Sequence, residues 1–189
     1  MHNESWQTRV AAWLVGMFLL GVGLYSAWTY MKVSVTGGDD AKDPSEYAHA
    51  LQAWKDPEQI RHFPPSIPPS ATNVRLSYFA GFMQGGPHLQ VRMKVSPAEA
   101  AEALNRFGKI ANHRFEGGKS TNHLRERDGV WTTSFFTGDD PANLRFPDSY
   151  TLLVLDAQDR GGGTWNHGKT AGVAVNTSRS EIVYWAETW

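Results

Sequence analysis

The residues with the most suggestive chemistry form a polar stripe beside a glycine turn. Gln90 and Arg92 lie two positions apart in the alternating segment 89–95, so on a strand they share one face. A guanidinium binds a planar carboxylate through two parallel hydrogen bonds, and an amide offers both a donor and an acceptor. The pattern predicts a site for a carboxylate or a partner peptide, formed by Gln84, Gly85, Gly86, Gln90 and Arg92.

The same stripe has an ordinary alternative interpretation. Its polar residues alternate with Val91, Met93 and Val95, which is typical of an antiparallel sheet with one solvated face. His62 or His88 beside the stripe would supply a group for acid–base chemistry, as in a hydrolase. A binding surface, a small-ligand or hydrolase site and a plain solvated face therefore all remain open.

Other familiar chemistries lack their sequence patterns. No two histidines have HxH or HxxxH spacing and the chain has no cysteine, so we expect no metal site. The GxSxG pattern of a nucleophile elbow is absent. The glycine-rich segment 161–168 lacks the Gly-Lys-Ser/Thr ending of a phosphate-binding loop. No catalytic residue and no cofactor is assigned.

Composition narrows the possible partners and the compartment. The 189 residues carry a formal net charge of −1 with Lys and Arg scattered, so we expect no nucleic-acid partner. The absence of cysteine excludes disulfides, a thiolate nucleophile and a lipid-modified cysteine. A chain without cysteine is compatible with an oxidising envelope compartment.

An uncharged apolar run over residues 10–31 is flanked by Arg9 and Lys32. At about 1.5 Å per residue it is roughly 33 Å long as a helix, close to the thickness of a bilayer core. Tyr25 stands where a cleavable signal needs a small residue, which favours an uncleaved single-pass anchor over a secretory signal. We expect a tail at 1–9 inside, a linker at 32–44 and a domain at 45–189 on the non-cytoplasmic side.

The domain is predicted to be α+β with a mostly antiparallel sheet and two to three helices. Asp43-Pro44, Asp56-Pro57 and the capping box Ser96-Pro97-Ala98-Glu99 each predict a helix start. Between the second and third starts, Pro64–Pro69 is interpreted as a rigid strap, with a polyproline ligand as the alternative. Strands are expected near 73–82, 89–95, 130–136, 150–155, 172–175 and 181–186.

The end of the chain is rich in aromatic residues. Tyr184, Trp185 and Trp189 either dock the last strand into the core or form an exposed interaction patch. Core docking is the favoured interpretation, because each buried ring would contribute core area.

Several phrases resemble a family of bacterial proteins of uncharacterised function. They are the HFPxxIP pattern at 62–68, the GFxQGG pattern at 81–86 with LQVR at 89–92, and the ending EIVYWAExW at 181–189. Ala80 stands where the family pattern has proline. The resemblance covers roughly residues 45–189. It implies a bacterial envelope protein with one apolar segment or signal ahead of one domain, and it implies no reaction.

Together these observations predict a single-pass envelope protein that acts as a non-enzymatic protein-interaction module. Its partners would be the lipid bilayer, through residues 10–31, and a protein of the membrane or envelope. The alternative is an envelope hydrolase or small-ligand-binding domain that uses the Gln84–Arg92 face.

Overall fold

The computed structural model describes residues 13–26, 41–81, 85–118, 126–127, 129–161 and 167–189. The chain divides into two compact units, Met1–Gly38 and Asp39–Trp189. In the first unit, residues 13–26 form a helix whose side chains are exposed. Among the described residues, no helix combines the length and the apolar character that a membrane crossing requires. The predicted apolar run at 10–31 extends beyond the described helix at both ends.

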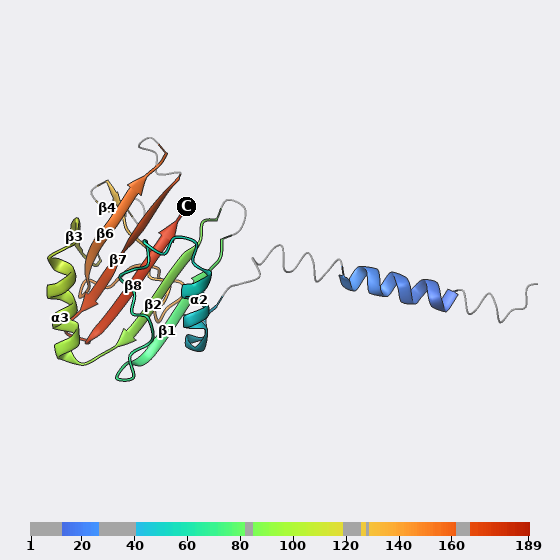
Figure 1. Cartoon of the computed structure of the whole chain (residues 1–189), viewed down its shortest axis with the longest axis horizontal. Coiled ribbons are helices and arrows are strands. Elements are labelled where there is room, and N and C mark those ends of the chain that lie inside the picture. Colours follow the sequence, from blue (N-terminus) through green and yellow to red (C-terminus); the bar gives the residue numbers. More distant parts are fainter. Residues whose placement is uncertain (1–12, 27–40, 82–84, 119–125, 128, 162–166) are drawn as a thin grey trace, which may run out of the picture. The chain divides into compact units, whose positions relative to one another are not determined.

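The second unit is an antiparallel sheet with two helices (Figure 1). Its six strands lie in the order β1-β2-β8-β7-β6-β3, and every neighbouring pair is antiparallel. A separate two-stranded ribbon pairs β4 with β5. The element bounds are η1 Pro44–Glu46, α2 Tyr47–Ala53, β1 Thr72–Phe79, β2 His88–Lys94, α3 Pro97–Gly108, β3 His113–Glu116, β4 Glu126–Arg127, β5 Val130–Trp131, β6 Thr151–Asp159, β7 Gly168–Asn176 and β8 Glu181–Thr188. The predicted α+β class with a mostly antiparallel sheet is confirmed.

One face of the sheet, called the helix face below, packs against α2 and α3. The larger hydrophobic core lies here, and its sheet residues include Leu89, Val91 and Met93 of β2. Tyr47 and Trp54 from the α2 region and Phe107 from α3 complete it. The strap packs on the same core through Phe63 and Ile67, and the Tyr47 hydroxyl donates to the Pro64 carbonyl at 2.7 Å. The strap interpretation of the proline segment agrees with these contacts.

The opposite face, called the loop face below, is covered by the chain between residues 130 and 150. A second hydrophobic core forms here from sheet residues such as Leu152, Val183 and Trp185. Phe135, Phe146 and Tyr150 cover them, with ring centroids 4.5–5.4 Å apart. Both faces of the sheet are therefore buried, although only one of them carries helices.

Two of the three predicted helix starts are confirmed. Asp43 caps η1, which leads directly into α2. Ser96 and Glu99 form a reciprocal capping box at α3, because each side chain accepts a hydrogen bond from the other residue's backbone N–H. The third start, at Asp56-Pro57, leads into residues 57–62, which form successive turns closed by i to i+3 hydrogen bonds. The prolines at 64 and 65 leave this segment too short to continue as a helix.

The predicted strand at 130–136 is wrong over most of its length. Only Val130–Trp131 is a strand, and residues 132–135 run as irregular chain across the loop face. Their polar groups bond to side chains of the sheet, so no strand partner is needed. The short edge strand β3 was not predicted, because a strand of four residues carries too little pattern.

The last strand docks into the sheet between β2 and β7, as favoured by the sequence. Trp185 is fully buried on the loop face, and Tyr184 is buried on the helix face beside Phe63 and Phe107. Trp189 stacks on Trp131 with ring centroids 5.0 Å apart. The aromatic ending therefore belongs to the core and does not form an exposed patch.

Candidate binding groove

The predicted polar stripe lies on the loop face. Gln90 and Arg92 of β2 share this face with His88, as their spacing predicted. Neither Gln90 nor Arg92 is open to solvent, because residues 132–139 cover them. The alternative of a plain solvated face is therefore wrong for these two residues. Gln84 lies outside the described residues.

Gln90 is fully buried and bonded through both ends of its amide. Its Nε2 donates to the Ser134 carbonyl at 2.8 Å. Its Oε1 accepts from the backbone N–H and from the hydroxyl of Thr137, both at 2.9 Å. A buried polar group is tolerated when its hydrogen bonds are made, so Gln90 fastens the covering segment to the sheet.

Arg92 is the centre of an arginine cluster, formed by Arg75, Arg92 and Arg179 around Asp139. The buried Arg92 guanidinium donates to both carboxylate oxygens of Asp139, at 2.7 and 3.4 Å. Arg75 lies 2.9 Å and Arg179 3.7 Å from the same carboxylate. The hydrogen bond from Arg92, with the positive charges nearby, lowers the pKa of Asp139. Arg92 therefore binds a carboxylate, as its chemistry predicted, but that carboxylate belongs to the same chain.

A second carboxylate lies beneath this cluster. Glu181 is buried, accepts a short hydrogen bond from the Tyr150 hydroxyl and lies 3.3 Å from Arg179. Burial, followed by the bond to Glu181, raises the pKa of Tyr150, so its hydroxyl remains a donor at neutral pH. The cluster thus continues into the core as a hydrogen-bonded network.

The glycine turn and His88 are placed by close packing. A Cβ atom added to Gly86 would lie 1.7 Å from the Thr188 carbonyl oxygen, so only glycine fits this approach of the two backbones. The His88 ring stacks on Phe136 with centroids 3.9 Å apart, and its Nε2 lies 3.0 Å from the Ser77 hydroxyl. Gly85 is exposed at the same end of β2. The structure places His88, Gln90 and Arg92 on one face of the sheet, where residues 132–139 of the same chain pack over them.

His62, the remaining predicted site residue, lies on the helix face and is separated from the stripe by the sheet. Its Nε2 is 3.0 Å from the Gly172 carbonyl and 3.2 Å from the Trp185 carbonyl, which are register partners in β7 and β8. Both partners are acceptors, so Nε2 carries the proton and donates. Burial lowers the pKa of His62 to about 4. At neutral pH this ring is an uncharged donor fixed to the sheet.

Gln59 makes the same kind of contact two register pairs further along the ladder of β7 and β8. Its Nε2 donates to the carbonyls of Thr170 and Glu187, at 3.0 and 2.9 Å. Its Oε1 accepts from Trp54 Nε1 at 3.2 Å. Gln59 and His62 together hold the turn segment 57–63 above the seam between β7 and β8.

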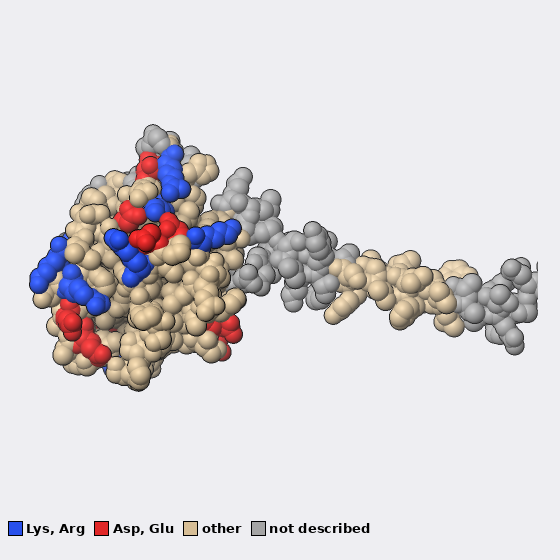
Figure 2. All heavy atoms as spheres, in the orientation of Figure 1, with Lys and Arg blue, Asp and Glu red and all other residues tan. Residues whose placement is uncertain are grey.

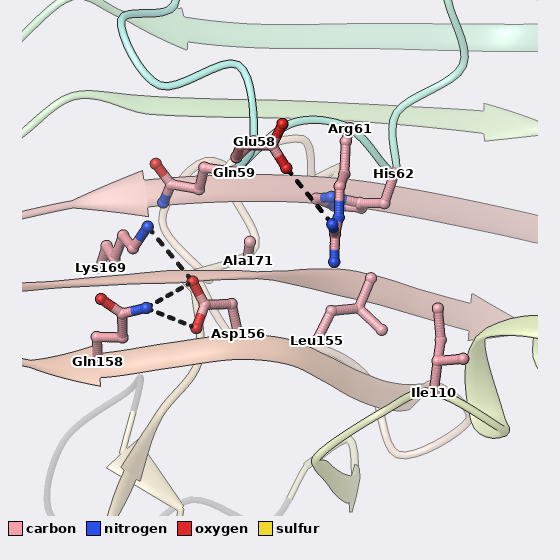
Figure 3. A pocket seen from close by; sticks show the side chains of 10 residues that line it. All are labelled: Glu58, Gln59, Arg61, His62, Ile110, Leu155, Asp156, Gln158, Lys169 and Ala171. Carbon is pink, nitrogen blue, oxygen red and sulfur yellow. Dashed lines mark hydrogen bonds and ion pairs between the residues drawn. The ribbon is translucent and has the colours of Figure 1, made fainter.

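A groove of about 480 Å³ opens between this turn segment and the strands β6 and β7 (Figure 3). Its lining residues are Glu58, Gln59, Arg61, His62, Ile110, Leu155, Asp156, Gln158, Lys169 and Ala171. Figure 2 shows acidic and basic side chains next to one another over the ends of β6 and β7, with a second set along α3. The groove is a charged concave site on the described part of the helix face.

A β-bulge in β6 creates one wall of the groove. Val154 pairs with Gly172 and Asp156 pairs with Ala171, so Leu155 is an extra residue in the ladder. Leu155 and Asp156 consequently both face the groove, whereas strict alternation would turn Asp156 toward the loop-face core. Asn112 supports the bulge, since its backbone N–H donates to the Val154 carbonyl and its amide donates to the Leu155 carbonyl.

Lys169 lies on the floor of the groove between two carboxylates. Its Nζ is 3.0 Å from Asp56 Oδ2 and 3.5 Å from Asp156 Oδ2. The hydrogen bond from Lys169 lowers the pKa of Asp56, although burial opposes that shift. Gln158 donates to both oxygens of Asp156, at 3.2 and 3.3 Å. The groove therefore presents a carboxylate group beside a fixed ammonium group.

Sequence reasoning missed this groove because its parts come from four separate segments. Asp156, Gln158 and Lys169 each look like ordinary polar residues at the ends of strands. The sequence signal that could have pointed to Asp156 is the break in alternation at Leu155-Asp156, where two residues of one strand turn to one side. His62 was chosen as a candidate, and it does border this groove.

The arrangement is suited to binding. In the part of the chain that the structure describes, no group of three or more histidine, aspartate and glutamate side chains could hold a metal ion. His62 is held by two carbonyls, and burial lowers its pKa to about 4, so its ring is a weak base at neutral pH. Comparison with known proteins adds no further assignment: no protein-family model, no curated protein and no solved structure matches this chain.

Proposed function

We propose that this chain is a membrane-anchored binding module of a bacterial envelope, and that its folded unit takes a partner segment in the groove between residues 57–63 and the strands β6 and β7. The observation that carries the proposal is the way the groove is built. A β-bulge turns Asp156 outward, and two buried side chains hold the opposite wall in place. Bulges beside binding sites commonly re-aim a side chain in this way.

Two observations support the anchor. Residues 13–26 are helical and expose large apolar side chains, with Trp13, Phe18 and Leu20 between 65 and 74% exposed. Such surface is stable in contact with lipid or with another apolar helix. The uncharged sequence continues on both sides of this helix from residue 10 to residue 31. The assignment to a bacterial envelope rests on the resemblance of the HFPxxIP, GFxQGG and EIVYWAExW phrases.

The contacts of the polar stripe favour binding in the groove over the alternative at the Gln84–Arg92 face. A ligand for Arg92 would have to displace Asp139 and lift the covering segment from Gln90. The groove needs no such rearrangement, because its charged side chains already reach solvent. Pre-formed concave sites are the usual places for ligands.

The test is site-specific photo-crosslinking of the full-length chain in intact cells. A benzophenone amino acid replaces Gln158, an exposed residue of the groove. In the matched control it replaces Arg145, an exposed residue of the segment 130–150 that covers the loop face. We expect a discrete adduct from position 158 and none from position 145, in the membrane fraction. Removal of residues 1–31 should release the chain from that fraction.

Two results would contradict the proposal. Equal or absent adduct formation at the two positions would show that the groove takes no partner. A chain that stays soluble with residues 1–31 present would contradict the anchor, independently of the groove.

A further inference from the structure

The groove has an imbalance of charge on its floor. Asp56 and Asp156 share the single ammonium group of Lys169, and the two carboxylates are still 41 and 35% exposed. The rim pair Arg61–Glu58 lies at 3.4 Å with both side chains about 80% exposed, so it neutralises itself in solvent. Among the described residues, one negative charge on the floor therefore has no cation of its own.

The opposite end of the groove is apolar. Ile110 is 61% exposed, and no other large hydrophobic side chain among the described residues of the Asp39–Trp189 unit is exposed. Leu155 lines the groove beside it, and Figure 3 shows both at the far end from Lys169 and Gln158. An exposed isoleucine at the end of a charged groove offers apolar surface that a ligand can cover.

We infer that the occupant of this groove is a peptide segment with a basic residue next to a branched apolar residue. The ammonium or guanidinium group binds Asp156 and Asp56, and the apolar side chain packs on Ile110 and Leu155. Asp156 and Leu155 are adjacent in β6 and both line the groove, so an extended segment can reach both. This inference specifies the ligand of the proposed binding module and rests on that function.

The charges facing the ligand fit this choice. Two carboxylates, Glu58 and Asp156, and two cations, Arg61 and Lys169, line the groove. Asp56 adds a third carboxylate beside it, 3.0 Å from Lys169 Nζ. Complementary charge strengthens the encounter and selects against partners of the same sign. A basic peptide is therefore favoured, and an acidic one is repelled by the floor.

The experiment titrates the full-length chain in detergent micelles with three capped probes, acetyl-Leu-Lys-Leu-amide, acetyl-Leu-Gln-Leu-amide and acetyl-Leu-Glu-Leu-amide. Binding is followed by the amide NMR signals of Gln158, Lys169 and Ala171. We expect the lysine probe to bind about tenfold more tightly than the glutamate probe, with the preference declining as salt is added.

Two variants and a control localise the effect. Asp156→Asn should remove most of the preference for lysine, and Ile110→Ser should weaken all three probes equally. Asp148→Asn, at an exposed position of the segment 130–150, should change neither the preference for lysine nor the affinity for the probes. Melting temperatures of the variants confirm that each is folded.

Three outcomes overturn the inference. They are a preference for the glutamate probe, equal binding of all three probes, and a lysine preference that survives Asp156→Asn. Each leaves the proposed function standing if the benzophenone at position 158 still captures a partner. If that adduct is also absent, the proposed function fails together with the inference.

Discussion

The arginine cluster on the loop face and the Lys169 site on the helix face are both built from ion pairs, but the ratio of cations to carboxylates is reversed between them. In the cluster, three guanidinium groups meet one carboxylate, Asp139. In the groove, two carboxylates meet one ammonium group, Lys169. The central cation is nearly buried in both places, at 5% exposure for Arg92 and 13% for Lys169.

The difference lies in what surrounds each ion pair. Arg92 sits beside Gln90 and Glu181 under a covering segment, so its cluster is part of a buried network. Lys169 lies beside a groove, and both of its acidic partners reach solvent. Ion pairs therefore fasten two layers of the fold on one face, whereas on the other they leave charged groups exposed to solvent. Four predictions test this distinction, in order of decreasing expected effect.

The largest effect is expected at Gln90. Replacement by leucine keeps the volume but leaves the Thr137 N–H and the Ser134 carbonyl buried without their partner. We expect the free energy of unfolding to fall by about 4 kcal/mol, measured by urea denaturation. Gln158→Leu, the same change at an exposed position of the groove, should cost under about 0.5 kcal/mol. Equal losses at the two positions would remove the distinction between the faces.

The second prediction concerns the pH dependence of stability that the buried His62 gives to the helix face. The pKa of this histidine is about 4 in the folded chain, against 6.5 as its ordinary value. The unfolded chain therefore binds more protons between these values, and the stabilising contribution is present above pH 6.5 and lost as the pH falls toward 4. We expect the loss of stability between pH 7 and pH 5 to be about 2 kcal/mol smaller in His62→Gln than in the unaltered chain. Identical pH profiles would show that the turn segment is not held by the neutral ring.

Removal of each central cation gives the most direct comparison. Arg92→Met loses two hydrogen bonds and the packing of the guanidinium over Phe135, and we expect a loss of about 2 kcal/mol in stability. Lys169→Met leaves two carboxylates that water can solvate, and we expect about 1 kcal/mol. Chemical denaturation of both variants in low and high salt measures the two values. A larger loss for Lys169→Met would reverse the roles of the two sites.

The smallest effect is expected at the rim. Arg61→Ala removes an exposed pair with Glu58, so stability should change by under about 0.5 kcal/mol. Binding of the lysine probe should become slightly tighter, because one cation that repels it is gone. Isothermal titration of this variant beside Arg145→Ala, an exposed arginine away from the groove, checks both values. A clear loss of stability would place Arg61 among the structural residues.

The fold was predictable where local chemistry alone decides it. Ser96-Pro97-Ala98-Glu99 begins a helix by satisfying its own backbone, and the alternation at 89–95 predicts a strand, although both faces of that strand are buried. Residues 132–137 gave a misleading signal, because their threonines and phenylalanines have strand propensity but bond to side chains of another layer. No local pattern reveals such a layer.

The candidate site was predictable only in part. The pairing of Arg92 with a carboxylate was correct in chemistry, but the carboxylate is Asp139 of the same chain. His62 was identified as a site candidate and borders the groove, yet nothing near it in sequence indicates β6 or β7 as the opposite wall. Contacts across 110 positions, such as that between His62 and Gly172, arise from topology and leave no local trace.

The bulge at Leu155 makes the groove depend on the length of a strand. Insertion of one residue between Ala171 and Gly172 would give Leu155 a partner in β7, restore regular alternation in β6 and rotate Asp156 from the groove toward the aromatic core of the loop face. A carboxylate would leave the groove and a charge would enter the core, although no residue of the groove had been substituted. For this site, a change in the spacing of residues has more severe consequences than a change in their identity.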